Sequence, residues 1–461
     1  MKIIFVEARG TSRYPHNGLA YLAGNLGAGH NVKIFDLNIL DIREDELINR
    51  LQKEKPDLVG FSTKSFNLKN TLALAKKIKL ATTSVLVVGG PHITLCAREF
   101  FEKDNADVFD FGFQGEAEIT FSKFCDVFDQ QKEYEKIPGL IYKNNGKIIF
   151  NDNNLVDNLD SLNFPDFSCF EGELDFDGRE GYPLLTSRGC PYKCIYCSVS
   201  KISGGKWRFR NPTNVLEELQ QAIIKYGIKS FQIIDDNFTM DIVRAKNFCR
   251  LLIEQNLNLR WSCPNGLRAD RLDEELVDLM KKSGCESVSL GIESGDEKVF
   301  NFINKGEQLE DITKAVKILK KHNISVTGFF IIGLPFETKK SVKKTLNFIN
   351  KLGLTGVKWN MLIPYPKTFL WDWVLKNGRF VKSFTDGQHF SKQKTVQPVF
   401  ETNDYSAQQR VTSYKIANLS TGSYSYIFQR PKNKILFYLK YALLLLRYNP
   451  ILFFRKLIKH L

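Results

Sequence analysis

The sequence predicts an α/β protein with a doubly wound, Rossmann-like domain in front, a partial (β/α)6 barrel behind it and a helical basic extension at the end. Three observations lead to this prediction. The chain has 461 residues, more than one hydrophobic core usually spans. Short β-branched runs alternate with segments of helical spacing, and they do so in two separate stretches. The net charge of +14 is concentrated near the end of the chain.

The first stretch, residues 1–135, carries the pattern of a parallel sheet. Strands are expected where β-branched residues cluster, and helical spacing separates each cluster from the next. Ligands of such sheets bind at the carboxyl ends of the strands, where "GFST", "GGPH" and "GFQGEAE" are placed. The expected strands are 2–6, 31–37, 58–62, 85–90 and 108–113.

Residues 136–180 are expected to form a linker with a hairpin around Asn-Asn-Gly. Residues 181–365 then repeat the alternation of strands and helices with six β/α units. Six units are too few for a closed eight-stranded barrel, so a partial barrel is expected, with the chemistry at the carboxyl ends of its strands.

The extension, residues 366–461, is strongly basic at its end. No acidic residue follows Asp404, whereas ten Lys and Arg residues do. Residues 433–461 mix Leu, Phe and Tyr with these bases, which predicts an amphipathic helix in an anionic membrane interface. A basic helix docked on the barrel is the alternative. The apolar content is too high for a nucleic-acid-binding arm, so no nucleic acid is expected.

The compartment is predicted from the nine cysteines and the chain start. An odd count without a recognisable secretory signal argues against a disulfide scaffold. We therefore expect a cytoplasmic protein, with peripheral contact at the inner face of the membrane if the tail binds lipid.

Three of the cysteines lie together in "TSRGCPYKCIYCSVS", at Cys190, Cys194 and Cys197. Their spacing differs from that of a zinc ribbon, and no histidine is near enough in sequence to complete a tetrahedral site. Three soft thiolates in one loop suit an iron–sulfur cluster that keeps one iron open. A zinc site with a distant fourth cysteine and chance clustering are the alternatives.

The pattern resembles the signature Cys-x3-Cys-x2-Cys of the radical S-adenosylmethionine (SAM) superfamily, including the aromatic Tyr196 before the last cysteine. The resemblance implies a 4Fe–4S cluster whose open iron binds SAM. It also implies that an electron passed into SAM releases a 5′-deoxyadenosyl radical.

The same resemblance assigns SAM contacts at the ends of the other barrel strands. In each case a helix cap or a buried ion pair is the alternative. The expected contacts are Asp235 and Asp236 in "IIDDNFT", Arg268 in "NGLRADRL", Glu293 and Ser294 in "GIESG", and Gly333 in "GFFIIGLPFE".

The front domain resembles the cobalamin-binding domain of one radical SAM subfamily, which includes anaerobic magnesium-protoporphyrin ester cyclase and class B methylases. The resemblance rests on "HNGLAYLAGNLGAGHNVKIFDLN", "DLVGFST", "VVGGPHIT" and "GFQGEAEITF". The cobalt-ligating Asp-x-His-x-x-Gly motif of cobalamin domains is absent. Implied cobalamin contacts are Gly60, Ser62, Thr63, Gly89 and Gly90, with turn chemistry as their alternative.

Together these resemblances imply a cobalamin-dependent radical SAM enzyme that methylates an unactivated carbon of a hydrophobic or lipid-like substrate, a small molecule or a lipid. An electron donor such as flavodoxin or ferredoxin would be its partner. The alternatives are an oxidative cyclase or rearrangement enzyme, a front domain without cobalamin, and a sensor without turnover. Methylthiolation of transfer RNA is disfavoured because residues 1–150 hold only Cys96 and Cys125.

Overall fold

The computed structural model describes residues 1–10, 14–102, 107–128, 133–153, 155–176, 181–383, 397–422, 442–444 and 446. The chain divides into two compact units. The described part of the first lies in Met1–Pro191 and Ser198–Asp236. That of the second lies in Tyr192–Cys197, Asn237–Ser383 and the described residues from Gln397 onward.

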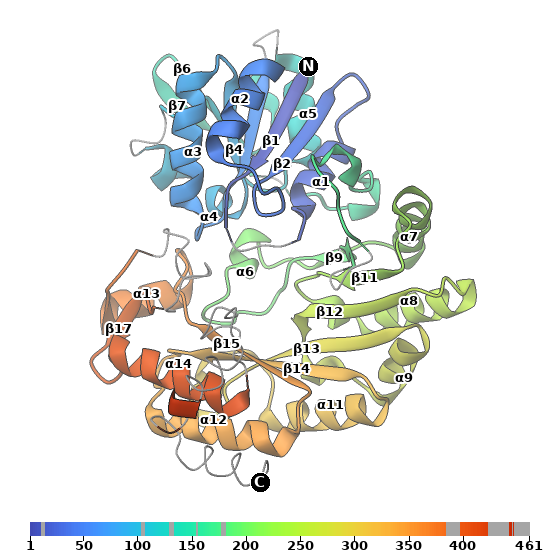
Figure 1. Cartoon of the computed structure of the whole chain (residues 1–461), viewed down its shortest axis with the longest axis vertical. Coiled ribbons are helices and arrows are strands. Elements are labelled where there is room, and N and C mark those ends of the chain that lie inside the picture. The colour runs from blue at the N-terminus through green and yellow to red at the C-terminus, as the bar shows by residue number, and fades with distance from the viewer. Residues whose placement is uncertain are drawn as a thin grey trace. The chain divides into compact units, whose positions relative to one another are not determined.

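The first unit opens with the expected doubly wound sheet (Figure 1). Its strand order is β2-β1-β3-β4-β5-β6-β7, and β1 to β5 run parallel. The elements are β1 (Lys2–Glu7), α1 (Asn17–Gly24), β2 (Asn31–Asp36), α2 (Glu44–Glu54), β3 (Leu58–Ser62), α3 (Leu68–Ala81), β4 (Val85–Gly89), α4 (Pro91–Phe101), β5 (Phe111–Phe113) and α5 (Glu118–Val127).

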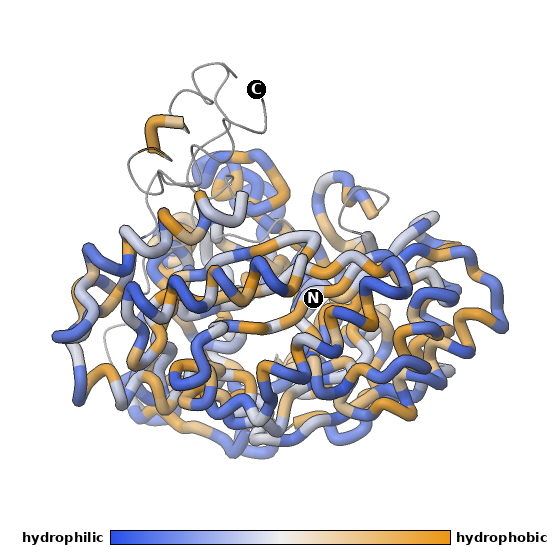
Figure 2. The backbone as a smooth tube through the Cα atoms, turned by 90° about the horizontal axis from the view of Figure 1, so that it is seen from below, coloured by the Kyte–Doolittle hydropathy of each residue, from blue (hydrophilic) through white to orange (hydrophobic). Residues whose placement is uncertain are grey.

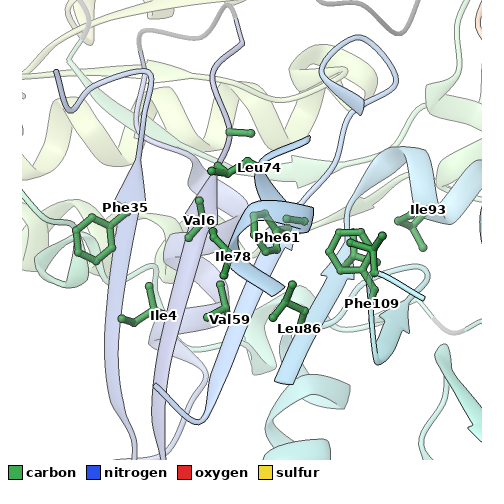
Figure 3. Packing of buried hydrophobic residues seen from close by; sticks show 14 of the residues in the cluster. Ile4, Val6, Phe35, Val59, Phe61, Leu74, Ile78, Leu86, Ile93 and Phe109 are labelled. Atoms are coloured by element: carbon green, nitrogen blue, oxygen red, sulfur yellow. The ribbon is translucent and has the colours of Figure 1, made fainter. Parts of the chain in front are cut away.

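Helices cover both faces of this sheet because successive strand residues point to opposite sides. Ile4 and Val6 belong to a core with Leu74 and Ile78 of α3 (Figure 3). Phe5 points the other way, and its ring lies 5.4 Å from that of Phe121 in α5. This double packing buries both faces and explains why the strands are almost wholly apolar.

The hairpin predicted in the linker is part of this sheet. Strands β6 (Leu140–Asn144) and β7 (Lys147–Phe150) turn at Asn145 and Gly146, which both have positive φ. β6 pairs antiparallel with β5 and so extends the sheet at its edge. The buried, apolar start of β6 explains the placement, because it needs a partner strand and a core that an isolated hairpin lacks.

The rest of the first unit begins the barrel. It consists of β8 (Tyr182–Leu184), β9 (Ser187–Arg188), α6 (Val199–Ile202), β10 (Arg208–Phe209), α7 (Pro212–Tyr226) and β11 (Ser230–Ile233). Strands β8 and β11 pair in parallel across the crossover helix α7. Asn211 caps α7 and Gly227 ends it in the left-handed conformation.

The second unit continues the alternation, and β12 to β15 form parallel pairs in sequence order. It consists of α8 (Ile242–Gln255), β12 (Arg260–Leu267), α9 (Glu274–Lys282), β13 (Cys285–Glu293), α10 (Glu297–Phe302), α11 (Leu309–Lys321), β14 (Ser325–Ile332), α12 (Lys339–Leu352), β15 (Gly356–Met361), α13 (Phe369–Asn377), β16 (Gly378–Phe380), β17 (Phe400–Thr402) and α14 (Ala407–Thr421). The six parallel barrel strands β8 and β11 to β15 confirm the predicted partial barrel.

Hydrophilic and hydrophobic residues alternate along the helices (Figure 2), as expected where one face packs on a sheet. In α12, for example, Val342, Thr345, Ile349 and Leu352 are buried at helical spacing. The basic segment 433–461, predicted to lie in a membrane interface, falls almost wholly outside the described residues. In the part that the structure describes, no helix combines the length and the apolar character needed to cross a bilayer.

Candidate functional site

The stretch before the first signature cysteine is held by one buried carboxylate. Asp235 follows β11 and is 3% exposed. One of its oxygens accepts the N–H of Thr186 at 2.6 Å, and the other accepts the hydroxyls of Thr186 and Ser187, both at 2.6 Å. Its neighbour Asp236 accepts the N–H of Gly189 at 3.0 Å.

Gly189 allows the chain to turn into Cys190. Its φ is +85°, and a Cβ atom there would lie 2.2 Å from the carbonyl oxygen of Lys206. Any other residue would therefore combine backbone strain with a steric clash. The pair Asp235 and Asp236, expected beside SAM, thus supports the backbone that leads into the cysteine loop.

The other two cysteines lie in a short turn of the second unit. Cys197 donates its N–H to the carbonyl of Cys194 at 3.1 Å. The buried Ile195 fixes this turn on both sides, because its N–H donates to Ile303 at 3.0 Å and its carbonyl accepts from Leu370 at 2.9 Å. The turn is therefore anchored to the end of α10 and the start of α13.

Tyr196 connects the same turn to β13. Its hydroxyl donates to Glu293 Oε1 at 2.9 Å. Glu293 ends β13 with φ of +63°, a conformation that costs free energy for a residue other than glycine and is frequent at functional sites. Burial raises the pKa of Glu293, while Lys305 and Tyr196 oppose the rise. The structure thus brings together two residues that the sequence assigned to the SAM site.

Two other residues that were predicted to contact SAM, Arg268 and Ser294, interact with other side chains of the protein. Arg268 stacks on the ring of Tyr192, with its guanidinium carbon 3.5 Å from the centroid. It also donates to Asp270 with two nitrogens, at 2.9 and 3.0 Å. Ser294 is buried against α12, where its hydroxyl lies 3.3 Å from Thr345 Oγ1. Their roles toward SAM stay predictions.

Cysteine chemistry fits the expected cluster. None of the three cysteines forms a disulfide, and each is partly exposed. Thiolates in a loop with a fixed backbone are the ligands that iron–sulfur clusters use. Among the described residues, no three His, Cys, Asp or Glu side chains converge on a point that could hold a single metal ion. The ligands of a cluster bind different iron atoms and need no such point.

At the carboxyl end of the front sheet, the predicted cobalamin contacts fall into two groups. Ser62, Thr63, Gly89 and Gly90 lie together, since Thr63 donates its N–H to Gly89 at 2.9 Å and a Cβ atom on Gly90 would lie 2.7 Å from Thr63 N. The hydroxyl of Thr63 is buried without a hydrogen-bond partner, which suits a site for a polar ligand. Gly60, in contrast, lies inside β3, where the ring of Phe5 fills the space of its missing Cβ.

Sequence reasoning missed a charged cluster at this edge. Glu7 ends β1 and Asp36 ends β2, and both are buried. Glu7 accepts from Lys64 at 3.0 Å, and its other oxygen lies 3.7 Å from His16 Nε2. Glu7 Oε2, Asp36 Oδ2 and His16 Nε2 lack hydrogen-bond partners. The signal was present in the sequence, since Glu7 and Asp36 end strands and Lys64 lies two residues after β3.

His16 does not supply the missing cobalt ligand in this arrangement. Its Nδ1 accepts the N–H of Leu19 at 3.1 Å and caps α1. The hydrogen of the neutral ring must then lie on Nε2, the nitrogen that faces Glu7. Burial lowers the pKa of His16 well below its usual value, so the ring is neutral.

Two glutamates of the loop "GFQGEAE", expected near a ligand, form ion pairs with arginines. Glu116 accepts two hydrogen bonds from Arg208, at 2.6 and 2.7 Å. Glu118 pairs with Arg188 at 2.7 Å. These ion pairs, each with one buried member, tie the front sheet to the segments on either side of the cysteine signature, all within the first unit.

Comparison with known proteins identifies both parts of the chain. Residues 184–349 match the model of the radical SAM superfamily, and residues 4–124 match that of the B12 binding domain. The uncharacterized methyltransferase PH0819 of Pyrococcus horikoshii is 31% identical over 423 residues, which cover 91% of this chain and 88% of the relative. The chain belongs to the radical SAM superfamily.

Other similar proteins are named as enzymes. The cytidylyl-2-hydroxyethylphosphonate methyltransferase of Streptomyces wedmorensis is 28% identical and covers 69% of this chain and 68% of its own. The anaerobic magnesium-protoporphyrin IX monomethyl ester cyclase of Rubrivivax gelatinosus is 26% identical and covers 79% and 68%. With PH0819, which is named as a methyltransferase, these relatives support an enzyme of a group that contains methyltransferases and a cyclase.

Solved structures agree with the fold. The radical SAM methyltransferase TsrM of Kitasatospora setae, with cobalamin and a [4Fe-4S] cluster bound, has a TM-score of 0.68 at 19% identity, over 81% of this chain and 74% of its own. The cobalamin-dependent enzyme OxsB with aqua-cobalamin bound has a TM-score of 0.63 at 17% identity, over 81% and 55%. The expected fold and the expected cofactors, a 4Fe–4S cluster, SAM and cobalamin, are confirmed.

The first prediction concerns the cysteine turn. Cys194→Ala is expected to abolish cleavage of SAM to 5′-deoxyadenosine, because one iron loses its thiolate, while the fold survives. Iron content and 5′-deoxyadenosine are measured after anaerobic reconstitution. Cys249→Ala, at a buried cysteine of α8, is the control and should retain the iron. Wild-type cleavage in Cys194→Ala would contradict the assignment.

The second prediction concerns Asp235. In Asp235→Asn the amide nitrogen cannot accept, so at least one hydrogen bond to the carboxylate is lost, at a cost of about 2 kcal/mol. The variant should bind less iron while it retains the corrinoid of the front domain. Asp241→Asn, at the N-cap of α8, is the control and should be nearly neutral. Equal iron content in Asp235→Asn and wild type would show that the anchor is dispensable.

The third prediction concerns Glu7, whose pKa burial raises from 4.5 to about 7. The folded protein holds a proton that the unfolded chain releases. The contribution of Glu7 to stability is therefore complete below pH ~4.5 and is lost as the pH rises through about 7. As the pH rises from about 5 to about 8, the free energy of unfolding of Glu7→Gln should therefore increase relative to that of wild type, by at most ~1.4 kcal/mol per pKa unit. A difference that does not change with pH would contradict the shift.

Proposed function

We propose that this radical SAM enzyme transfers a methyl group to an unactivated carbon of a hydrophobic small molecule or lipid. The observation that supports the choice of substrate is a group of aromatic side chains at the carboxyl ends of the barrel strands. Phe302 follows β13, Phe336 follows β14, and Phe369 and Trp373 follow β15. Chemistry in barrels of this kind takes place at these strand ends.

The aromatic group is open to solvent and packed edge to face. The rings of Phe302 and Phe336 lie 4.8 Å apart in a T-shaped arrangement. Phe336 is 49% exposed and Phe369 is 55% exposed, although large apolar side chains are usually buried. Phe336 also has φ of +63°, a strained value that the fold must hold in place. A cluster with these properties suits an apolar substrate surface.

When bound, the cofactors supply the radical and the methyl group, and the chain supplies position. Cys190, Cys194 and Cys197 would hold the cluster. The hydrogen bond from Tyr196 to Glu293 would keep the cysteine turn beside the end of β13. The aromatic group would orient the acceptor and keep water away from it.

Two further parts of the proposal concern the surroundings of the enzyme. A flavodoxin or ferredoxin would deliver the electron. The enzyme would be cytoplasmic, with peripheral membrane contact through residues 433–461, because this segment combines basic and apolar side chains.

The fourth prediction identifies the acceptor. The reconstituted full-length protein is incubated without oxygen with SAM that carries a deuterated methyl group, a reductant, and lipid or aqueous extracts of the producing cells. A labelled product in the lipid fraction is expected, together with equal amounts of S-adenosylhomocysteine and 5′-deoxyadenosine.

Phe336→Ala should raise the KM for that acceptor and leave the cleavage of SAM without acceptor unchanged. A labelled product confined to the aqueous fraction would contradict the substrate class. Loss of two hydrogens without label would identify an oxidative cyclase instead.

A further inference from the structure

Two tyrosines lie in the segments that separate the cysteines of the signature. Tyr192 stands between Cys190 and Cys194, and Tyr196 stands between Cys194 and Cys197. The hydroxyl of Tyr196 bonds to the end of β13, whereas Tyr192 is held by residues that directly follow β12. Each segment between two cysteines is therefore attached to a different barrel strand.

The ring of Tyr192 is covered on one face by Arg268, the first residue after β12. The guanidinium carbon of Arg268 lies 3.5 Å from the ring centroid. The hydroxyl of Tyr192 accepts a hydrogen bond from Arg271 Nη2 at 2.9 Å. A cation over the face of a tyrosine ring is attracted by the ring quadrupole, and the attraction is strongest when water is excluded. Because Arg268 is only 6% exposed, its contact with the ring is of this stronger kind.

The edge of the same guanidinium holds the loop 303–307, which connects α10 to α11. Arg268 Nη1 donates to the carbonyl of Lys305 at 2.6 Å, and Nη2 donates to that of Gly306 at 3.3 Å. The N–H of Ala269 adds a third bond between the end of β12 and this loop, since it donates to Glu307 Oε1 at 2.6 Å. The planar fork of an arginine is suited to such paired acceptors.

The loop 303–307 in turn holds the cysteine loop. The carbonyl of Ile303 accepts the N–H of Ile195 at 3.0 Å, and Asn304 Nδ2 donates to the carbonyl of Lys193 at 3.4 Å. The arginine is thus attached to the cysteine loop twice, directly through the tyrosine ring and indirectly through the loop 303–307.

The remaining hydrogen bonds of Arg268 go to Asp270. Nε and Nη2 donate to the two carboxylate oxygens at 2.9 and 3.0 Å. Both edges of the guanidinium that offer a pair of N–H groups are therefore taken, one by Asp270 and the other by the two carbonyls. A carboxylate of SAM would have to compete with these partners for a bidentate contact.

We propose that Arg268 is a positioning residue for the cysteine loop and not a ligand of SAM. Its face holds Tyr192 and its edge holds the loop 303–307. Cys194 is then presented by a backbone that is fixed on both sides. The proposal rests on the proposed function, in which the three signature cysteines hold the cluster.

Hydrogen exchange of the full-length chain before iron is added tests the proposal without SAM or cluster. Arg268→Met keeps an apolar stem and removes the guanidinium. The amide of Ile195 should then exchange at least about tenfold faster, as expected for the loss of one desolvated cation–π contact. Arg260→Met is the matched control, because Arg260 begins the same strand and is 58% exposed. It should change the rate by less than about twofold.

The cluster provides a second readout after anaerobic reconstitution. Arg268→Met should lose iron to a chelator at least about threefold faster than wild type, and the electron paramagnetic resonance spectrum of its reduced cluster should change. Tyr192→Leu removes the ring, leaves the other partners of Arg268 in place and should have the same effects. Tyr192→Phe keeps the ring and should stay within about threefold of wild type in both rates, because Arg271 is 36% exposed and water replaces the lost hydroxyl.

A double-mutant cycle shows whether the arginine acts through the tyrosine. For the exchange of the Ile195 amide, the combined effect of Arg268→Met and Tyr192→Leu should be at least about threefold smaller than the product of the two separate effects. A combined effect equal to that product would overturn the proposal, because the two side chains would then act independently.

The outcomes separate this inference from the function on which it rests. If Arg268→Met leaves either the exchange or the iron loss unchanged, the proposal is overturned. Weaker SAM binding with both rates unchanged would make Arg268 a ligand of SAM, as the sequence predicted. If Arg268→Met does not fold, Tyr192→Leu decides, and wild-type exchange at Ile195 in that variant overturns the proposal. A wild-type protein that takes up no four-iron cluster would instead contradict the proposed function.

Discussion

The cysteine loop depends on the three groups that donate to the carboxylate of Asp235. Both oxygens of this side chain accept hydrogen bonds from Thr186 and Ser187, and each bond is 2.6 Å long. A loop that must present thiols without regular secondary structure needs such an anchor, because its own backbone hydrogen bonds are few. Burial strengthens these hydrogen bonds, because water does not compete for the carboxylate oxygens.

The second half of the loop is held by a different device. Ile195 is held through its backbone between α10 and α13, and Tyr196 reaches the end of β13. The cysteine turn therefore depends on the end of β13 and on the helices that follow β13 and β15. Parts of the chain far apart in sequence thus contribute to the placement of a few side chains, as expected of a site that orients cofactors.

The sequence was sufficient for features that follow from local patterns. Residues 58–62 were predicted as a strand and form β3 with those bounds, because a continuous apolar run marks a strand buried on both faces. The cysteine signature was equally readable from its spacing. Tyr196 and Glu293 were each assigned to the site from the sequence, but the hydrogen bond between them was not predicted.

Features that depend on long-range partners were not readable. Nothing local indicates that Asp235 anchors a turn 49 residues earlier, or that Glu116 pairs with an arginine 92 residues later. Gly60 was assigned to a ligand, but its role inside β3 becomes visible only once the ring of Phe5 is placed beside it. A buried charge can be assigned a partner only after the fold has brought the two together.

The central claim is that three cysteines leave one iron of the cluster open for SAM. Electron–nuclear double resonance of the reduced protein, with SAM labelled in its amino nitrogen and carboxylate oxygens, tests this most directly. The account predicts magnetic coupling of both labels to the cluster. A four-iron cluster without coupling to either label, or a zinc ion held by four side chains, would contradict it.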